Sequence, residues 1–202
     1  MIKNRGAFIV GIKSTTLSKK EKKFLKKYKP WGVILFSRNL KEFKQIKKLT
    51  SAIRLIFKDK KYPILTDQEG GRVNRLNNLI EASVFTAEYF GNLYKKNKHK
   101  FYNYYKVYID QISYLLNELG ININTVPVLD VRKPKSSNII GDRSYSSIVK
   151  NVSKIGDFCI KEFKKQKLGT VIKHIPGHGL TIVDSHKKTP IVKFKYRYLI
   201  KN

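Results

Sequence analysis

The sequence predicts an α/β fold of the (β/α)8 TIM-barrel type, incomplete because it supplies about five of the eight β/α units. Short apolar runs alternate with segments of helical spacing, a rhythm typical of βαβ units and a parallel sheet. Polar clusters follow several of these runs, where barrel enzymes carry their active sites. The chain has 202 residues, whereas a complete barrel needs about 250 residues.

The N-terminal part of the chain predicts two strands separated by one helix. Residues 7–12 form an apolar run that predicts the first strand. Ser18 followed by Glu21 is a capping-box pattern, and it predicts a helix that ends near Pro30. Residues 32–36 predict the second strand, and their lack of alternation indicates that both faces are buried.

A helix, a short strand and a long helix are predicted next. Residues 43–57 place their apolar side chains on one helical face, and residues 63–66 predict the third strand. The longest helix is predicted over residues 101–119, with Gly120 as its natural stop.

Two further strands flank the last predicted helix. Residues 121–126 predict the fourth strand, although Asn122 and Asn124 weaken this prediction. Residues 149–163 predict a helix, and residues 169–172 predict the fifth strand. No glycine-rich phosphate fingerprint follows the first strand, which argues against nucleotide binding. An open doubly wound sheet remains the alternative to a barrel.

The composition indicates one globular domain over residues 1–202. Hydrophobic residues make up 41% of the chain, and no linker or repeat divides it. The single cysteine, Cys159, excludes an internal disulfide and fits a reducing compartment. No apolar run reaches the roughly 18 residues of a membrane helix, and the N-terminus lacks a signal-peptide pattern. We therefore predict a soluble cytoplasmic protein with no membrane partner.

The formal net charge of +29 is the most unusual feature of the composition. Most positive residues are lysines spread over the whole chain, whereas proteins that read bases rely on arginine. We attribute the charge mainly to compositional drift and expect nonspecific nucleic-acid binding at low salt. A basic nucleic-acid-binding protein remains the alternative from another functional class.

Residues 173–186 contain the strongest candidate for an active-site loop. Three of the four histidines lie here: His174, His178 and His186. One proline and two glycines exclude a regular helix, and titratable loops after strands are where α/β proteins place their chemistry. We expect His178 to hold the loop. Histidines four residues apart, such as His174 and His178, bind zinc together when they lie on a helix, and this segment is not helical. We therefore expect no metal; a loop-based zinc site with His186 is the alternative.

Five motifs occur along the chain in a fixed order: residues 32–39 (GVILFSRN), 66–73 (TDQEGGRV), 127–131 (PVLDV), 140–144 (IGDRS) and 173–179 (KHIPGHG). Together they resemble the bacterial β-N-acetylglucosaminidases of glycoside hydrolase family 3, from about Gly32 to Pro190. The resemblance implies a cytoplasmic enzyme of peptidoglycan recycling without a cofactor. The implied substrates are N-acetylglucosaminyl-anhydromuramic acid muropeptides, from which such enzymes remove terminal β-linked N-acetylglucosamine.

The resemblance also implies which residues bind the sugar. Asp67 and Arg75 match the family's contacts to the non-reducing sugar, and the remaining sugar-binding groups match Arg143, Lys173 and His174. Charged groups of these kinds form charge-assisted hydrogen bonds to hydroxyls. An internal salt bridge between Asp67 and Arg75 is the structural alternative.

Asp184 and His186 resemble the family's acid/base dyad. Most glycosidases use a carboxylic acid to protonate the leaving oxygen. The resemblance implies that His186 donates this proton and later activates water, while Asp184 fixes its tautomer. A histidine carries no negative charge and so repels an anionic acceptor less than a carboxylate does. Phosphorolysis is therefore a hypothesis beside hydrolysis.

The nucleophile of a retaining mechanism has no candidate in this sequence. The family's nucleophile is an aspartate near the end of a later strand, and no acidic residue follows Asp184 here. We expect a second copy of the chain or a complementing C-terminal chain to complete the site. The alternative is a noncatalytic remnant that binds saccharide.

Overall fold

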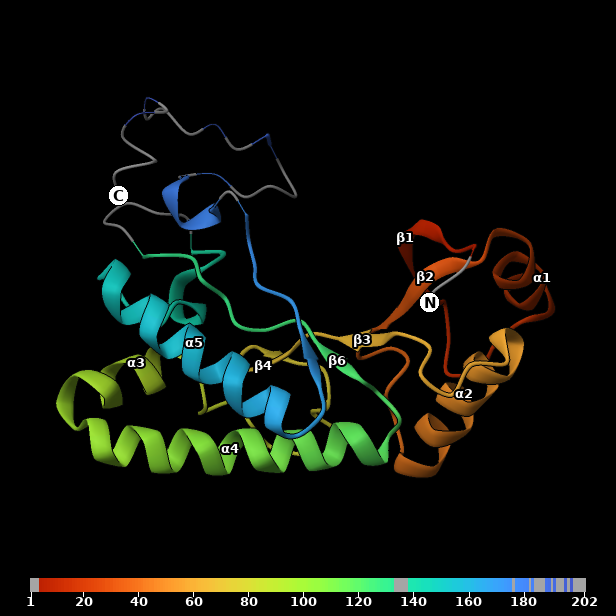
Figure 1. Ribbon diagram of the computed structural model, residues 1–202, viewed down its shortest axis with the longest axis horizontal. Helices are drawn as coiled ribbons and strands as arrows, with labels where there is room; N and C mark the ends of the chain where they lie inside the picture. Colours follow the sequence, from red (N-terminus) through yellow and green to blue (C-terminus); the bar gives the residue numbers. More distant parts are fainter. Residues whose placement is uncertain are drawn as a thin grey trace.

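A computed structural model gives the fold and describes residues 4–132, 138–175, 177–181, 183, 188, 189, 191, 195 and 197. The elements follow one another as β1 (Gly6–Gly11), α1 (Lys19–Tyr28), β2 (Pro30–Leu35), α2 (Phe43–Phe57), β3 (Ile64–Thr66), β4 (Gln68–Gly70), β5 (Val73–Asn74), α3 (Ala87–Lys96), α4 (Lys98–Glu118), β6 (Ile123–Asn124), η1 (Gly141–Arg143), α5 (Val149–Lys165), β7 (Gly169–Thr170) and η2 (His178–Leu180). Figure 1 shows α1 and α2 beside β1 and β2, with α3, α4 and α5 grouped at the other end.

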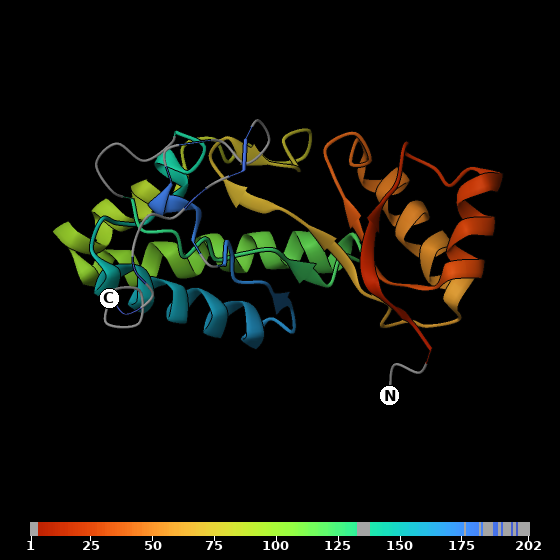
Figure 2. The same cartoon turned by 90° about the horizontal axis from the view of Figure 1, so that it is seen from above.

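The main sheet is parallel and its strands follow chain order. Its five strands are ordered β1-β2-β3-β6-β7, and every neighbouring pair is parallel. A doubly wound sheet would reverse its strand order at a switch point, whereas a barrel adds each strand beside the previous one. The predicted partial barrel is therefore confirmed over the doubly wound alternative. In Figure 2, seen from above, the red and orange strands β1 and β2 lie beside α1 and α2, and the blue strand β7 lies at the end of α5.

Two helices begin and end as the sequence predicts. The side chain of Ser18 accepts the backbone N–H of Glu21, and the carboxylate of Glu21 accepts the backbone N–H of Ser18. The predicted bounds of α2 agree with the structure, and its apolar stripe is buried against the core. Gly120 follows α4 with a φ of +73°, a left-handed conformation that ends the helix.

Other elements differ from the prediction. Helix α3 and the β4–β5 hairpin were not predicted, while β6 and β7 contain two residues each. The strand predicted over 121–126 is shorter in the structure, and the side chain of Asn124 at its end bonds both backbone groups of Gln68. These bonds join the end of β6 to the start of β4, while the backbone N–H of Thr125 donates to the carbonyl oxygen of Thr66 at 2.9 Å and continues the pairing with β3.

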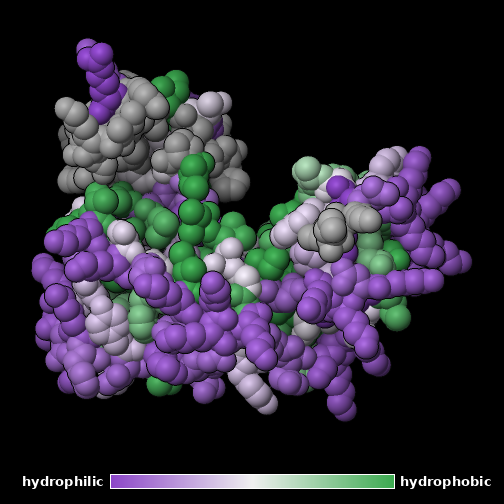
Figure 3. All heavy atoms as spheres, in the orientation of Figure 1, coloured by the Kyte–Doolittle hydropathy of each residue, from purple (hydrophilic) through white to green (hydrophobic). Residues whose placement is uncertain are grey.

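The core lies between the sheet and the helices. Buried side chains of α2, α4 and α5 pack into one cluster that includes Ile46, Ile53, Ile109, Ile112, Ile155 and Cys159. Among the described residues, no helix is long and apolar enough to cross a membrane. Figure 3 shows hydrophilic residues over much of the visible helical surface, in keeping with lysines that are spread over the chain.

Candidate functional site

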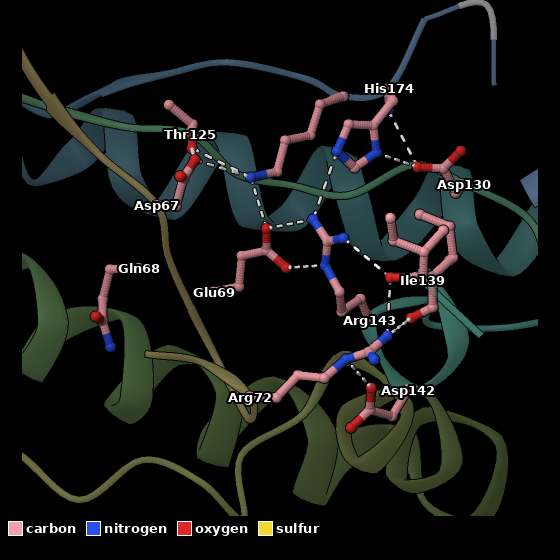
Figure 4. A network of polar contacts seen from close by, with 12 residues as sticks. Asp67, Gln68, Glu69, Arg72, Thr125, Asp130, Ile139, Asp142, Arg143 and His174 are labelled. Atoms are coloured by element: carbon pink, nitrogen blue, oxygen red, sulfur yellow. Dashed lines mark hydrogen bonds and ion pairs between the residues drawn. The ribbon is translucent and has the colours of Figure 1, made fainter. Parts of the chain in front are cut away.

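Four segments that follow the carboxyl ends of neighbouring strands meet in one polar cluster. Asp67 and Glu69 follow β3, and Thr125 and Asp130 follow β6. The chain beyond β7 brings Lys173 and His174, and η1 brings Arg143. Parallel strands end at the same edge of a sheet, so residues distant in sequence converge there. Figure 4 shows these side chains pointing toward one another.

Asp67 stands at one end of this cluster. Its carboxylate accepts hydrogen bonds from Lys173 Nζ at 3.2 Å and from the hydroxyl of Thr125, and Arg75 Nη2 lies 3.4 Å away. Burial raises the pKa of the Asp67 carboxyl, but the charge of Lys173 and these hydrogen bonds lower it below its usual value overall. Asp67 is therefore a carboxylate that presents acceptor oxygens.

Glu69 joins two cations in the middle of the cluster. Its Oε2 accepts from Arg143 Nε at 2.8 Å, and its Oε1 accepts from Arg143 Nη2 at 2.9 Å. The same Oε1 lies 2.6 Å from Lys173 Nζ. Burial raises the pKa of Glu69, while the hydrogen bonds from Arg143 and the charge of Lys173 lower it below its usual value. The result is a bidentate, charge-assisted fork.

Asp130 organises the loop that follows β7. Its carboxylate, whose side chain is 0% exposed, lies 2.6 Å from His174 Nδ1 and accepts the backbone N–H of His174 at 3.1 Å. It also accepts the backbone N–H groups of His178 and Gly179. Because burial raises the pKa of Asp130 but these hydrogen bonds lower it, the group is ionised and accepts only. Nδ1 of His174 therefore donates.

The ring of His174 then offers Nε2 as an acceptor. Arg143 Nη2 lies 3.4 Å from this nitrogen. The backbone of the loop packs closely here, because a Cβ at Gly179 would lie only 2.4 Å from the carbonyl oxygen of Val131. The loop therefore holds His174 against Asp130 on one side and Arg143 on the other.

The formal charges of the cluster cancel. Three cations, Arg75, Arg143 and Lys173, face three carboxylates, Asp67, Glu69 and Asp130. A neighbouring pair, Arg72 with Asp142, is balanced in the same way at 3.0 Å. A cluster of this kind offers many donors and acceptors without a net charge, which suits a neutral polyhydroxylated ligand better than an anion.

The five residues predicted to bind sugar, Asp67, Arg75, Arg143, Lys173 and His174, all lie in this cluster. The alternative interpretation, an internal salt bridge between Asp67 and Arg75, is also compatible with the structure, in which the two side chains are in contact at 3.4 Å. The predicted acid/base residues Asp184 and His186 lie outside the described residues. The roles of all seven stay predictions.

Sequence reasoning missed Glu69, Thr125 and Asp130 as parts of the site. Glu69 and Asp130 stood inside motifs that carried the resemblance, yet no role was given to them. The signal that was available is position, because a carboxylate that directly follows a buried strand in a barrel lies at the catalytic edge.

The part of the chain that the structure describes was expected to hold no metal ion. There, no group of three His, Cys, Asp or Glu side chains gathers as metal ligands do. The rings of His174 and His178 lie 6.1 Å apart, and the first is hydrogen-bonded to Asp130.

A parallel β/α sheet with a polar cluster at the carboxyl ends of its strands defines the class of the protein, a partial β/α barrel. Comparison with known families gives the particular one. Residues 3–202 match the family described as "Glycosyl hydrolase family 3 N terminal domain", and the chain belongs to this family. The predicted resemblance is thereby confirmed.

Individual relatives agree with this assignment. The chain is 36% identical over 183 residues to beta-hexosaminidase A of Pseudoalteromonas piscicida, covering 88% of this chain and 30% of that protein. It is 34% identical over 189 residues to a beta-hexosaminidase of Haemophilus ducreyi, covering 90% of this chain and 52% of that protein. The chain thus spans about half, or less, of the length of these relatives.

Solved structures show the same fold. NagZ from Neisseria gonorrhoeae in complex with N-trifluoroacetyl-D-glucosamine superposes with a TM-score of 0.88 at 26% identity, covering 98% of this chain and 57% of that one. A glycoside hydrolase family 3 beta-N-acetylglucosaminidase from Paenibacillus gives a TM-score of 0.80 at 28% identity, covering 96% of this chain and 36% of that one.

Proposed function

We propose that the chain carries the sugar-binding part of a β-N-acetylglucosaminidase, a glycoside hydrolase that removes terminal β-linked N-acetylglucosamine from cell-wall muropeptides. The observation that carries the proposal is the charge-balanced cluster at the carboxyl edge of the sheet. The names of the relatives support N-acetylglucosamine as the sugar that the cluster binds. We take N-acetylglucosaminyl-anhydromuramic acid muropeptides as the substrates and the cytoplasm as the place of the reaction.

The cluster supplies complementary partners for sugar hydroxyls. A hydroxyl both donates and accepts, so it needs an acceptor and a donor within reach. Asp67 accepts, and Lys173 and Arg143 donate. His174 accepts at Nε2, because its Nδ1–H donates to the carboxylate of Asp130. Charge-assisted bonds of this kind are the stronger class of hydrogen bond. They hold the sugar in one orientation.

The acid/base step belongs in this proposal to His186 and Asp184. His186 donates its proton to the leaving glycosidic oxygen and then takes a proton from the attacking water. Asp184 accepts the other ring N–H, which fixes the tautomer that can donate.

The retaining mechanism also needs a carboxylate nucleophile on the opposite face of the sugar. Asp67, Glu69 and Asp130 all accept from cations or from N–H groups, which lowers their nucleophilicity. We assign the nucleophile to none of them. In this proposal it comes from another polypeptide segment, as a complementing C-terminal chain or a second copy.

Binding is tested with the full 202-residue chain and N-acetylglucosamine, by amide shifts in NMR titration. We expect saturable binding that Lys173→Met abolishes. Lys161→Met is the matched control, because Lys161 pairs with Asp157 on the surface of α5, where both side chains are exposed. Absence of saturable binding to the wild-type chain contradicts the proposal.

Turnover is tested by release of nitrophenol from 4-nitrophenyl N-acetyl-β-glucosaminide. The chain is mixed with the C-terminal part of NagZ from Neisseria gonorrhoeae, and we expect activity that His186→Ala removes. The same reaction in phosphate buffer distinguishes hydrolysis from phosphorolysis, since only phosphorolysis releases a sugar 1-phosphate. DNA retention that depends on salt, without saccharide binding, would favour the nucleic-acid-binding alternative.

A further inference from the structure

Glu69 has no sugar contact assigned to it, yet it joins two of the proposed sugar-binding cations. Its two carboxylate oxygens accept from Nε and Nη2 of Arg143 at 2.8 and 2.9 Å. One of them also contacts Lys173 Nζ at 2.6 Å. Figure 4 shows the carboxylate of Glu69 facing the guanidinium of Arg143, with dashed lines between them.

These contacts are shielded from water. The side chain of Glu69 is 7% exposed, and those of Arg143 and Lys173 are 14% exposed. Electrostatic interactions are stronger where solvent is excluded, so the pairs are worth more than surface salt bridges. The geometry of a bidentate fork adds direction, because only one orientation of the guanidinium satisfies both bonds.

Other contacts leave little freedom to the two cations once Glu69 is in place. Nη1 of Arg143 donates to the carbonyl oxygen of Ile139 at 3.1 Å. Nζ of Lys173 has Asp67 and Thr125 within 3.2 Å, in addition to Glu69. Glu69 is the shared partner that relates the position of Arg143 to that of Lys173.

We propose that Glu69 is a positioning and specificity-determining residue, which fixes Arg143 and Lys173 for a neutral saccharide and prevents them from binding an anion. The identity of the saccharide rests on the proposed function, but the positioning and the charge compensation do not. Without the Glu69 carboxylate, three cations would face two carboxylates in the cluster. Arg143 and Lys173 would then form a site for an oxyanion.

The substitution Glu69→Gln tests this proposal with little change of shape. One oxygen is replaced by an amide nitrogen, which can only donate, so at least one N–H of Arg143 or Lys173 loses its acceptor. Glu88→Gln is the matched control, because Glu88 pairs with Arg132 at 2.5 Å and both side chains are about half exposed. It removes the same charge from a surface arginine pair.

The first readout is the exchange of the Arg143 Nε proton with water, measured by arginine NMR and assigned with Arg143→Lys. We expect exchange to become about tenfold faster or more in Glu69→Gln and to stay unchanged in Glu88→Gln. Unchanged exchange in Glu69→Gln overturns the positioning role, whether or not the protein binds sugar.

The second readout is ligand choice, with N-acetylglucosamine and inorganic phosphate as probes. In Glu69→Gln we expect saccharide affinity to fall about tenfold and phosphate affinity to rise by a similar factor. No gain of phosphate binding overturns the specificity role. If the wild-type chain does not bind N-acetylglucosamine, the proposed function fails. The exchange of the Arg143 Nε proton and the binding of phosphate still test the role of Glu69 in that case.

Chemical rescue covers the case in which Glu69→Gln does not fold. Glu69→Ala leaves a space that formate, a small carboxylate, can enter. We expect formate to restore slow exchange of the Arg143 Nε proton, whereas formamide, which has no negative charge, does not. Equal effects of formate and formamide, or no effect of either, overturn the proposal.

Discussion

The carboxylate of Asp130 lies 2.6 Å from Nδ1 of His174 and accepts the backbone N–H of the same residue at 3.1 Å. One buried group therefore fixes both the ring and the main chain of a residue in the candidate site. The same carboxylate accepts the backbone N–H of Gly179 at 2.8 Å. Asp130 thus ties together the loop after β7.

Asp130→Asn is expected to destabilise the protein by about 3 kcal/mol, because the amide nitrogen would face buried donors in place of an acceptor. The free energy of unfolding in urea measures this change. Asp157→Asn is the control, since Asp157 pairs with Lys161 on the surface, and it should cost less than about 1 kcal/mol. Equal effects of the two substitutions contradict the role given to Asp130.

Stability should fall in acid. The pKa values of Asp67, Glu69 and Asp130 are all lowered in the folded state. A group with a lowered pKa stabilises the fold fully above its unfolded pKa, and this contribution is lost as the pH falls through the folded value. The ordinary values are 3.8 for Asp and 4.5 for Glu, so the loss begins near these values and grows below them.

Unfolding in urea at several pH values from neutral to acid measures this dependence. The variant Glu69→Gln lacks one of the three groups, so its free energy of unfolding should fall less steeply below about pH 4.5. A slope equal to that of the wild-type chain would show that Glu69 has no lowered pKa in the folded state.

Much of the fold could be predicted because its signals are local. The cap of α1 lies within four consecutive residues, and the stripe of α2 repeats within one helix. Helix α3 also has local signals, which the sequence prediction overlooked: Thr86 caps it by accepting the N–H of Tyr89, and Phe90 and Tyr94 lie on one buried face. The link between β6 and β4 depends on Asn124, whose partner Gln68 is 56 residues away, so the local sequence could not reveal it.

The same distinction between local and long-range signals applies to the residues of the site. Motifs located Asp67, Arg143 and Lys173, because each lies in a recognisable segment. Nothing in the local sequence indicates that Glu69 pairs with Arg143, which lies 74 residues away. Such a contact depends on how the ends of parallel strands meet, and it is visible only in the folded chain.

Gly70 is expected to be essential for the position of its neighbour Glu69. Its φ is +92°, and a Cβ there would lie 2.3 Å from the backbone oxygen of Phe85. Gly70→Ala should therefore cost about 2 kcal/mol or more, measured by thermal or urea unfolding. At Gly6 a Cβ would meet mainly the side chain of Phe8, which can move, so Gly6→Ala should cost clearly less. A reversed order contradicts the prediction.

The contact between Arg75 and Asp67 has two interpretations, an internal salt bridge and a sugar-binding pair, and a substitution of Arg75 can separate them. The pair is 3.4 Å apart and the Arg75 side chain is 30% exposed, so the salt bridge adds little to stability. Among the described residues, the buried Nε of Arg75 has no hydrogen-bond partner, which leaves a donor for a ligand or water. Lysine keeps the charge of this position and removes that donor.

Arg75→Lys should therefore change the free energy of unfolding by less than about 1 kcal/mol. It should weaken binding of N-acetylglucosamine about tenfold, because the lost donor would have contacted the sugar. Urea unfolding and NMR titration of the same variant measure the two quantities. A purely internal salt bridge leaves the saccharide affinity unchanged, and that result would remove Arg75 from the binding site.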